Sequence, residues 1–207
     1  AAGLLTIGNA APSYDTPVHR SPSPSATSWP VPSCAHDGSA GTLRSVVAAA
    51  ASGDTIDLSQ LNCSTITLTQ GEIAISQDDL TLDGPGAANL TVSGAAASRV
   101  LAHGGAGTLS IHALGIAHGY SQSAPGGCLS SAASISIDAV TVSDCHASKN
   151  SYQLGGGIYA AGSVSANASA ISGNTAYNGG GIFVKGNLTL TGSTVSANYA
   201  YLGGGLF

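Results

Sequence analysis

The sequence predicts an all-β fold, a right-handed parallel β-helix, and three observations support that prediction. The motif Gly-Gly-Gly followed by two apolar residues begins at Gly155, Gly179 and Gly203, so it recurs every 24 residues. A fixed period of roughly 20 to 50 residues is typical of stacked repeat architectures. Apolar and small polar residues alternate within each unit, as over residues 188–191, which indicates strands rather than helices. Three short strands with Gly- and Asn-rich bends need about 24 residues, the length of one β-helix coil.

The repeat extends beyond the glycines. Five further pairs recur at the same offset: Val164/Leu188, Ile171/Val195, Asn174/Asn198, Ala176/Ala200 and Tyr177/Tyr201. Successive coils of a β-helix are one strand spacing apart, about 4.8 Å. We therefore expect each residue to stack on its equivalent in the next coil.

Two parts of the chain differ in composition. Residues 1–33 contain six of the eight prolines among Ser, Ala and Thr, which predicts an extended Pro/Ser-rich leader or a strap on the surface. Residues 34–207 form the predicted β-helix domain.

The spacing predicts a short helix over residues 42–51. Four apolar residues recur at i, i+3, i+4 and i+7: Leu43, Val46, Val47 and Ala50. Gly53 follows as the expected C-terminal stop. Because an open first coil would expose unpaired backbone and apolar side chains, we expect this helix to cap the solenoid.

Strands are predicted from Asp54 onward. The first five cover residues 56–58, 66–68, 73–75, 80–82 and 90–92. Gly71, Asp78-Asp79 and the run from Asp83 to Gly86 lie between them and are residues typical of bends. Residues 108–116 match the pattern of residues 187–195, so the repeat extends back toward this region.

The four cysteines are expected to form two disulfides. Residues 126–129 align with residues 155–158 at an offset of 29, which leaves about five extra residues around 149–152. This alignment puts Cys128 in the column of the third glycine and Cys145 in the column of Asn174 and Asn198. We predict a Cys128–Cys145 disulfide within one coil and a Cys34–Cys63 disulfide between leader and first coil. The alternative is four free thiols.

Composition limits the function classes. The net charge is −5 and the five Lys and Arg residues are scattered, so nucleic acid is not an expected partner. No apolar run approaches the ~20 residues of a membrane span. The start Ala1-Ala2-Gly3 is what removal of a signal peptide would leave, and an even cysteine count without Cys-x-x-Cys favours an oxidising compartment. We expect a secreted or cell-surface protein.

The repeats resemble those of known bacterial surface proteins. The combination of Gly-Gly-x-Ile with hydrophobic-x-x-Asn, at residues 171–174 and 195–198, resembles the repeats of polymorphic outer-membrane proteins. The segment from Gly41 to Gly86 is similar to the N-terminal portion of secreted bacterial β-helix proteins with C-terminal anchoring or sorting domains. The resemblance implies a parallel β-helix, a bacterial extracellular location and a surface or adhesive role.

Aromatic residues occupy two columns of the repeat. Tyr159, Phe183 and Phe207 share one register, and Tyr177 and Tyr201 share another. An exposed strip of stacked rings beside Ser and Thr would suit carbohydrate or protein binding. The alternative is a structural stack that shields the glycine bend. Asn174 and Asn198 are expected to form a structural ladder, with amides bonding between coils.

A catalytic site on a pectate-lyase-like β-helix would need clustered carboxylates, either as Ca²⁺ ligands or as an acid/base pair. Asp78, Asp79 and Asp83 could form an acidic patch, although their positions also suit bends. His103, His112 and His118 lie within 16 residues, but convergence on a metal would require two corners of the coil to meet. We therefore predict no catalytic residues, no metal site and no cofactor.

The resulting hypothesis is a non-enzymatic extracellular or cell-surface protein that adheres to glycans or to host or cell-surface proteins. A polysaccharide lyase or glycosidase is one alternative, and a self-assembling fibre or scaffold component is another. The third Gly-Gly-Gly unit stops at Phe207, one strand into a coil. We expect further coils, or a partner fragment, to stack on that end.

Overall fold

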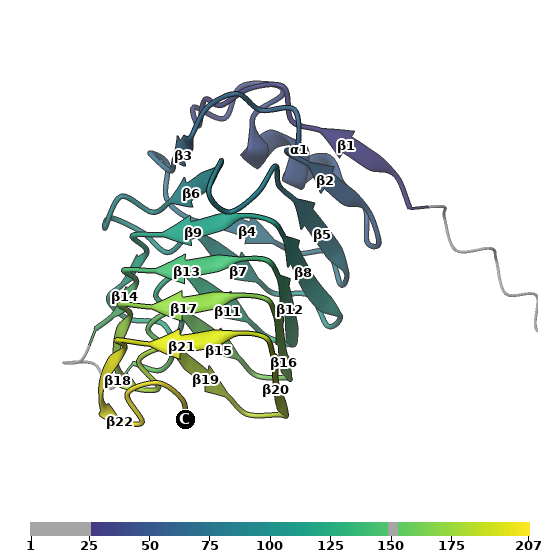
Figure 1. Cartoon of the computed structure of the whole chain (residues 1–207). Helices are drawn as coiled ribbons and strands as arrows, with labels where there is room; N and C mark the ends of the chain where they lie inside the picture. Colours follow the sequence, from purple (N-terminus) through teal and green to yellow (C-terminus); the bar gives the residue numbers. More distant parts are fainter. Residues whose placement is uncertain (1–25, 149–152) are drawn as a thin grey trace, which may run out of the picture.

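The computed structural model describes residues 26–148 and 153–207, and it is a parallel β-solenoid (Figure 1). The predicted fold class is therefore confirmed. Most of the leader and the extra residues at 149–152 lie outside the described residues. All paired strands run parallel, and equivalent strands of successive coils lie side by side (Figure 1).

The strands form four sheets along the solenoid. The first sheet contains β1 (Ser28–Pro30), β2 (Thr55–Asp57), β5 (Leu80–Asp83), β8 (Thr108–His112), β12 (Ser134–Asp138), β16 (Val164–Asn167) and β20 (Leu188–Thr191). The second contains β3 (Thr65–Thr67), β6 (Thr91–Ser93), β9 (Gly115–Ala117), β13 (Thr141–Ser143), β17 (Ala170–Ser172) and β21 (Thr194–Ser196). The third contains β4 (Ile73–Ile75), β7 (Leu101–His103), β11 (Leu129–Ser131), β15 (Ile158–Ala160) and β19 (Ile182–Val184). The fourth contains β10 (Tyr120–Ser121), β14 (His146–Ala147), β18 (Thr175–Asn178) and β22 (Tyr199–Leu202).

The fourth sheet corrects the prediction of three strands per coil. Its strands begin only at β10, and the first two are two residues long. Such a strand contributes one inward side chain, for example Ala147, so its sequence shows no alternation. Hydropathy patterns cannot detect a strand of this length.

The coil length also differs from a constant 24 residues. The register offset is 24 from Val164 to Leu188, but 26 from Thr55 to Thr81 and 29 from Leu80 to Leu109. The additional residues lie in bends such as 84–90, and the strands keep their register. The 24-residue period holds for the last coils, which are the most regular ones.

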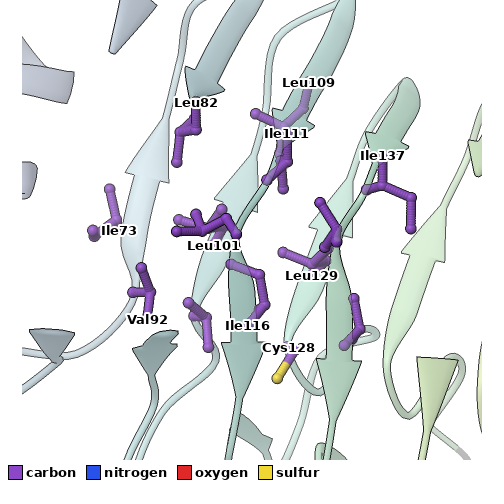
Figure 2. Close-up of a cluster of buried hydrophobic side chains, with 14 of the residues drawn as sticks. Ile73, Leu82, Val92, Leu101, Leu109, Ile111, Ile116, Cys128, Leu129 and Ile137 are labelled. Carbon is purple, nitrogen blue, oxygen red and sulfur yellow. The ribbon is translucent and has the colours of Figure 1, made fainter. Parts of the chain in front are cut away.

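The interior is a continuous column of aliphatic side chains (Figure 2). Ile111 pairs in register with Leu82 on one side and with Ile137 on the other, and all three are at most 1% exposed. Burial of a side chain of this size contributes roughly 1.5–3 kcal/mol. Stacking of equivalent residues therefore supplies the main stabilising term, as the repeat predicted.

Helix α1 (Leu43–Ala49) packs against β2 and β4 at the end of the solenoid where the strands begin (Figure 1). The apolar face predicted from the sequence is buried, with Leu43 fully inaccessible. Gly53, however, does not end the helix. Ala50 is the C-cap residue and is already extended, and Gln77 Nε2 donates to the carbonyls of Val47 and Ala50. A side chain from another coil therefore satisfies the helix end.

β1 lies at the end of the predicted leader and pairs with the edge of β2, with Trp29 opposite Ile56. Asp54 holds this strand in place, because its carboxylate accepts hydrogen bonds from Thr27 N, Trp29 Nε1 and Ala51 N at 2.7–2.8 Å. These bonds, led by the one from Thr27, hold the pKa of Asp54 below its ordinary value.

Both disulfides pair as the sequence predicted. Cys34–Cys63 joins the segment after β1 to the first coil. Cys128–Cys145 lies in the interior, with both residues at most 1% exposed. The described part of the chain contains no free cysteine.

Candidate functional site

The Gly-Gly-Gly bends connect the fourth sheet to the third. A Cβ added to Gly156 would lie 2.2 Å from the carbonyl oxygen of Gly180 and 2.6 Å from the backbone of Thr175. Real Cβ atoms do not approach backbone so closely, so the two coils can stack here only with glycine. The bends therefore fix where the following strands β15 and β19 present their side chains.

The first aromatic ladder consists of Tyr159, Phe183 and Phe207 and follows these bends. The ring centroids are 5.7 Å apart for Tyr159–Phe183 and 5.3 Å apart for Phe183–Phe207, with interplanar angles of 17° and 10°. The separation exceeds the strand spacing of about 4.8 Å because the rings are offset. Tyr159 and Phe183 are half-buried and Phe207 is 51% exposed.

The first ladder ends at Tyr159. In register with Tyr159 the third sheet carries Ser130, then Ala102, then Ala74, none of which can continue the stack. A hollow of about 350 Å³ lies over the two alanines, and its other lining residues are Ile75, Ser76, His103 and Gly104. The outer face of the third sheet is thus a floor of small residues beside an aromatic ladder.

Charged groups border this face. Lys185 Nζ lies 6.0 Å from the centroid of the Tyr159 ring. Arg99 Nε pairs with Glu72 Oε2 at 2.7 Å, and its guanidinium also donates to the carbonyl of Pro125. Glu72 directly precedes β4 and Arg99 lies just before β7. The ion pair therefore joins two neighbouring coils at the edge of the third sheet.

The second predicted column is also a ladder. Tyr177 and Tyr201 stack with centroids 5.2 Å apart and an interplanar angle of 23°. On the same sheet Tyr120 stacks on His146 at 5.6 Å and 8°. The repeat pattern does not reveal this pair, because its two residues differ in type and their offset is 26 rather than 24.

Asn174 and Asn198 bond between coils. Asn174 Nδ2 donates to Asn198 Oδ1 and to the carbonyl of Val142, both at 3.0 Å, while its Oδ1 accepts from Cys145 N. Asn198 Nδ2 donates to the carbonyl of Ile171 at 2.9 Å. Each amide therefore satisfies backbone groups at a bend, which is a structural role.

The structure also brings together polar residues that are far apart in the sequence. Asp57, Asp83, His112 and Asp138 end successive strands of the first sheet and pair in register. His112 Nδ1 lies 3.8 Å from Asp138 Oδ2, and Asn167 Nδ2 donates to Asp138 Oδ1 at 2.6 Å. The signal available in the sequence was that each of these residues directly precedes a bend.

Asp78 and Asp79, two members of the possible acidic patch, accept hydrogen bonds from the backbone of the next coil. Asp78 Oδ1 accepts from Ala106 N at 2.8 Å, and Asp79 Oδ1 accepts from Thr108 N at 2.7 Å. Asp83 lies apart from them at the end of β5. The three residues therefore do not act as one site.

The three histidines considered for a metal are in separate environments. His103 is buried and contacts Ser131 Oγ at 2.8 Å and the carbonyl of Gln77 at 2.9 Å. His112 lies on the first sheet and His118 occupies a bend with φ of 51°. Within residues 26–148 and 153–207 no three His, Cys, Asp or Glu side chains are placed to hold a metal ion.

Comparison with protein-family models, with curated proteins and with solved structures gave no match. Among the described residues there is no helix of the length and hydropathy that a membrane crossing requires.

Proposed function

We propose that this chain is a non-enzymatic extracellular binding protein that recognises carbohydrate where the first ladder ends. The binding surface is the uncovered face of Tyr159 together with the small residues that follow it on the third sheet. The observation that carries the proposal is the end of the first ladder, where the half-buried ring of Tyr159 is followed along the third sheet by Ser130 and then by the two alanines under the 350 Å³ hollow. The two disulfides support an extracellular location, because such bonds persist in oxidising compartments. As part of this proposal we group the chain with the secreted or surface β-helix proteins of bacteria that its repeats resemble.

The geometry of the ladder limits how a sugar could bind. The rings stack along the solenoid axis, so a sugar that packs on the uncovered face of Tyr159 has its plane parallel to the rings. Its edge then rests on Ser130 and Ala102. A glycan chain in this orientation crosses the solenoid in the strand direction instead of following the axis.

A glycan array with the purified chain tests the proposal. Tyr159→Ala should weaken binding by about tenfold or more, since it removes the ring face on which the sugar packs and the apolar area buried there. The matched controls are Tyr120→Ala, on the fourth sheet, and the double variant Tyr177→Ala/Tyr201→Ala. Loss of binding in the double variant alone would move the site to the second ladder.

Absence of binding to every glycan by the unmodified chain would overturn the proposal. In that case, pull-down with cell-surface proteins tests protein adhesion, and light scattering against concentration tests self-assembly. Capture of a cell-surface protein would indicate an adhesin, and scattering that rises with concentration would indicate a fibre or scaffold component.

One observation favours a second candidate function, glycoside hydrolysis. Asp83 and Asp138 lie two strands apart on the first sheet with His112 between them, which by strand spacing is about 9.6 Å. Inverting glycosidases place their two carboxyl groups roughly 6.5–9.5 Å apart. Release of reducing sugar from a polysaccharide, abolished by Asp138→Asn and retained in Asp78→Asn, would establish this activity in place of passive binding.

A further inference from the structure

His36 lies between the disulfide residue Cys34 and helix α1, and its side chain is buried, with the residue 5% exposed. Both ring nitrogens face hydrogen-bond donors. The backbone N–H of Thr69 points at Nδ1 with an N···N distance of 3.1 Å, and Arg44 Nε points at Nε2 at 3.2 Å. The carbonyl of His36 also accepts from Thr69 Oγ1 at 3.0 Å.

This arrangement suits only an uncharged ring. A backbone amide and a guanidinium always carry their protons, so both donors are fixed. A neutral imidazole has one unprotonated nitrogen and can accept one of the two bonds fully. A protonated imidazole has no acceptor, and its charge would lie beside that of Arg44.

The surroundings of His36 also favour its uncharged form, because their net effect is to lower its pKa. Burial and the Arg44 charge from α1 lower the pKa of His36, and the neighbouring carboxylate of Asp37 opposes them to a smaller extent. Asp37 is itself bonded to the backbone and side chain of Ser39. The turn after β3 presents Thr69 through its backbone and hydroxyl, so it supplies no compensating negative charge.

The contacts of His36 connect the cap to the first coil. Arg44 bridges from His36 to the carbonyls of Gln70 and Gly71, on the same turn as Thr69. The start of α1 is therefore fixed to the turn after β3 by His36 and Arg44 together. The end of α1 is held separately, by Gln77 and Asp54.

We propose that His36 is an acid-sensitive latch, whose protonation releases residues 35–42 and the first turn of α1 from the first coil. The Cys34–Cys63 disulfide retains the released segment, so the opening is local and reversible. Acid then uncovers apolar side chains under the cap, beginning with Leu43. This inference goes beyond the proposed binding function and does not depend on it.

Amide hydrogen exchange of the full chain between pH 7.5 and pH 4.5, corrected for intrinsic exchange rates, tests the latch. As pH falls from the ordinary pKa of 6.5 to the lower folded pKa of His36, protection of Thr69 and of the first turn of α1 should fall by up to tenfold per pH unit, as expected for one proton, and it should level off below the folded pKa. Protection of β15 and β19 should not change. His112→Gln, a change at a half-buried histidine on the first sheet, should retain the whole pH response.

His36→Gln should remove the pH dependence of that protection, because glutamine does not titrate. A pH response that persists in His36→Gln, or one that is equal in β15 and β19, would overturn the proposal. NMR titration of the His36 ring in the unmodified chain covers the case in which the variant does not fold. The latch is wrong if the ring gains its proton while Thr69 keeps its protection.

Discussion

The coils from β2 to β8 and the coils from β15 to β22 stack with the same strand geometry, but different side chains tie them together. In the early coils the offsets are 26 and 29 residues, and carboxylates reach across bends, as Asp54, Asp78 and Asp79 do. In the late coils the offset is 24, and residues bond to their own copies, as in the Asn174–Asn198 pair and the aromatic ladders. Where the coil length is constant, a residue stacks on the same type of residue in the next coil. Where the coil length varies, the coils are joined by hydrogen bonds that differ from one coil to the next.

The interior is common to both regions, so the largest effect is expected there. Ile137→Ala removes a side chain that is 1% exposed and stacked on Ile111, and it should lower the free energy of unfolding by about 3–4 kcal/mol. Denaturant unfolding measures this change. Ser136→Ala, the outward neighbour on the same strand, should change stability by less than about 0.5 kcal/mol. Equal losses in the two variants would contradict stacking as the main source of stability.

The Cys34–Cys63 disulfide should stabilise the early coils selectively. It closes 29 residues, and the chain-entropy estimate for such a loop is about 3–4 kcal/mol. The double variant Cys34→Ala/Cys63→Ala should lose hydrogen-exchange protection in α1 and β2 before β15 and β19. Simultaneous loss of protection in all four elements would show that the two regions unfold as one unit.

Asn174→Ala should destabilise the late coils. The substitution removes the side-chain acceptor of Cys145 N and one donor to the carbonyl of Val142 in a fully buried place, which costs about 2–3 kcal/mol. Asn187→Ala is the control, because the bonds of Asn187 to the preceding coil come from its backbone, which donates to Ser163 Oγ and accepts from Val164 N. Denaturant unfolding of the two variants should differ by at least about 1.5 kcal/mol.

Acid should act on the early coils through Asp54. Its pKa is lowered in the folded chain by the bonds from Thr27, Ala51 and Trp29, so its stabilising contribution is complete above the ordinary value of 3.8. That contribution is lost as pH falls through the lower folded value. Fluorescence of Trp29, the one tryptophan of the sequence, should report release of β1 as pH falls below that ordinary value. In Asp54→Asn this acid transition should be absent.

The smallest effect is expected at the bends between the first and second sheets. Ala168 has φ of 45° and shares its register position with Ala139 at 52° and Gly192 at 57°. The left-handed conformation costs a non-glycine residue roughly 1–2 kcal/mol, and glycine loses about 0.5–1 kcal/mol in backbone entropy. Ala168→Gly should therefore raise stability by up to about 1 kcal/mol, as measured by the unfolding midpoint. A drop in the midpoint would show that the Ala168 methyl group packs favourably.

The sequence by itself determined the solenoid, its strands in the late coils, the apolar face of the cap and both disulfide pairs. These features depend on periodicity and spacing, which are one-dimensional properties of the chain. The five early strands were placed within one residue of their observed positions for the same reason. The columns of Tyr159 and Tyr177 were visible because the offset between late coils is constant.

Only the tertiary structure decided which residues from coils of unequal length meet. The first three strands of the fourth sheet, the Tyr120–His146 stack and the row of Asp57, Asp83, His112 and Asp138 each join residues at offsets of 26 or 29. Bends absorb the additional residues while backbone hydrogen bonds hold the strands in register, so sequence distance no longer predicts contact. The position of the hollow has the same origin, because it depends on which small residues the register places on the third sheet beyond the end of the first ladder.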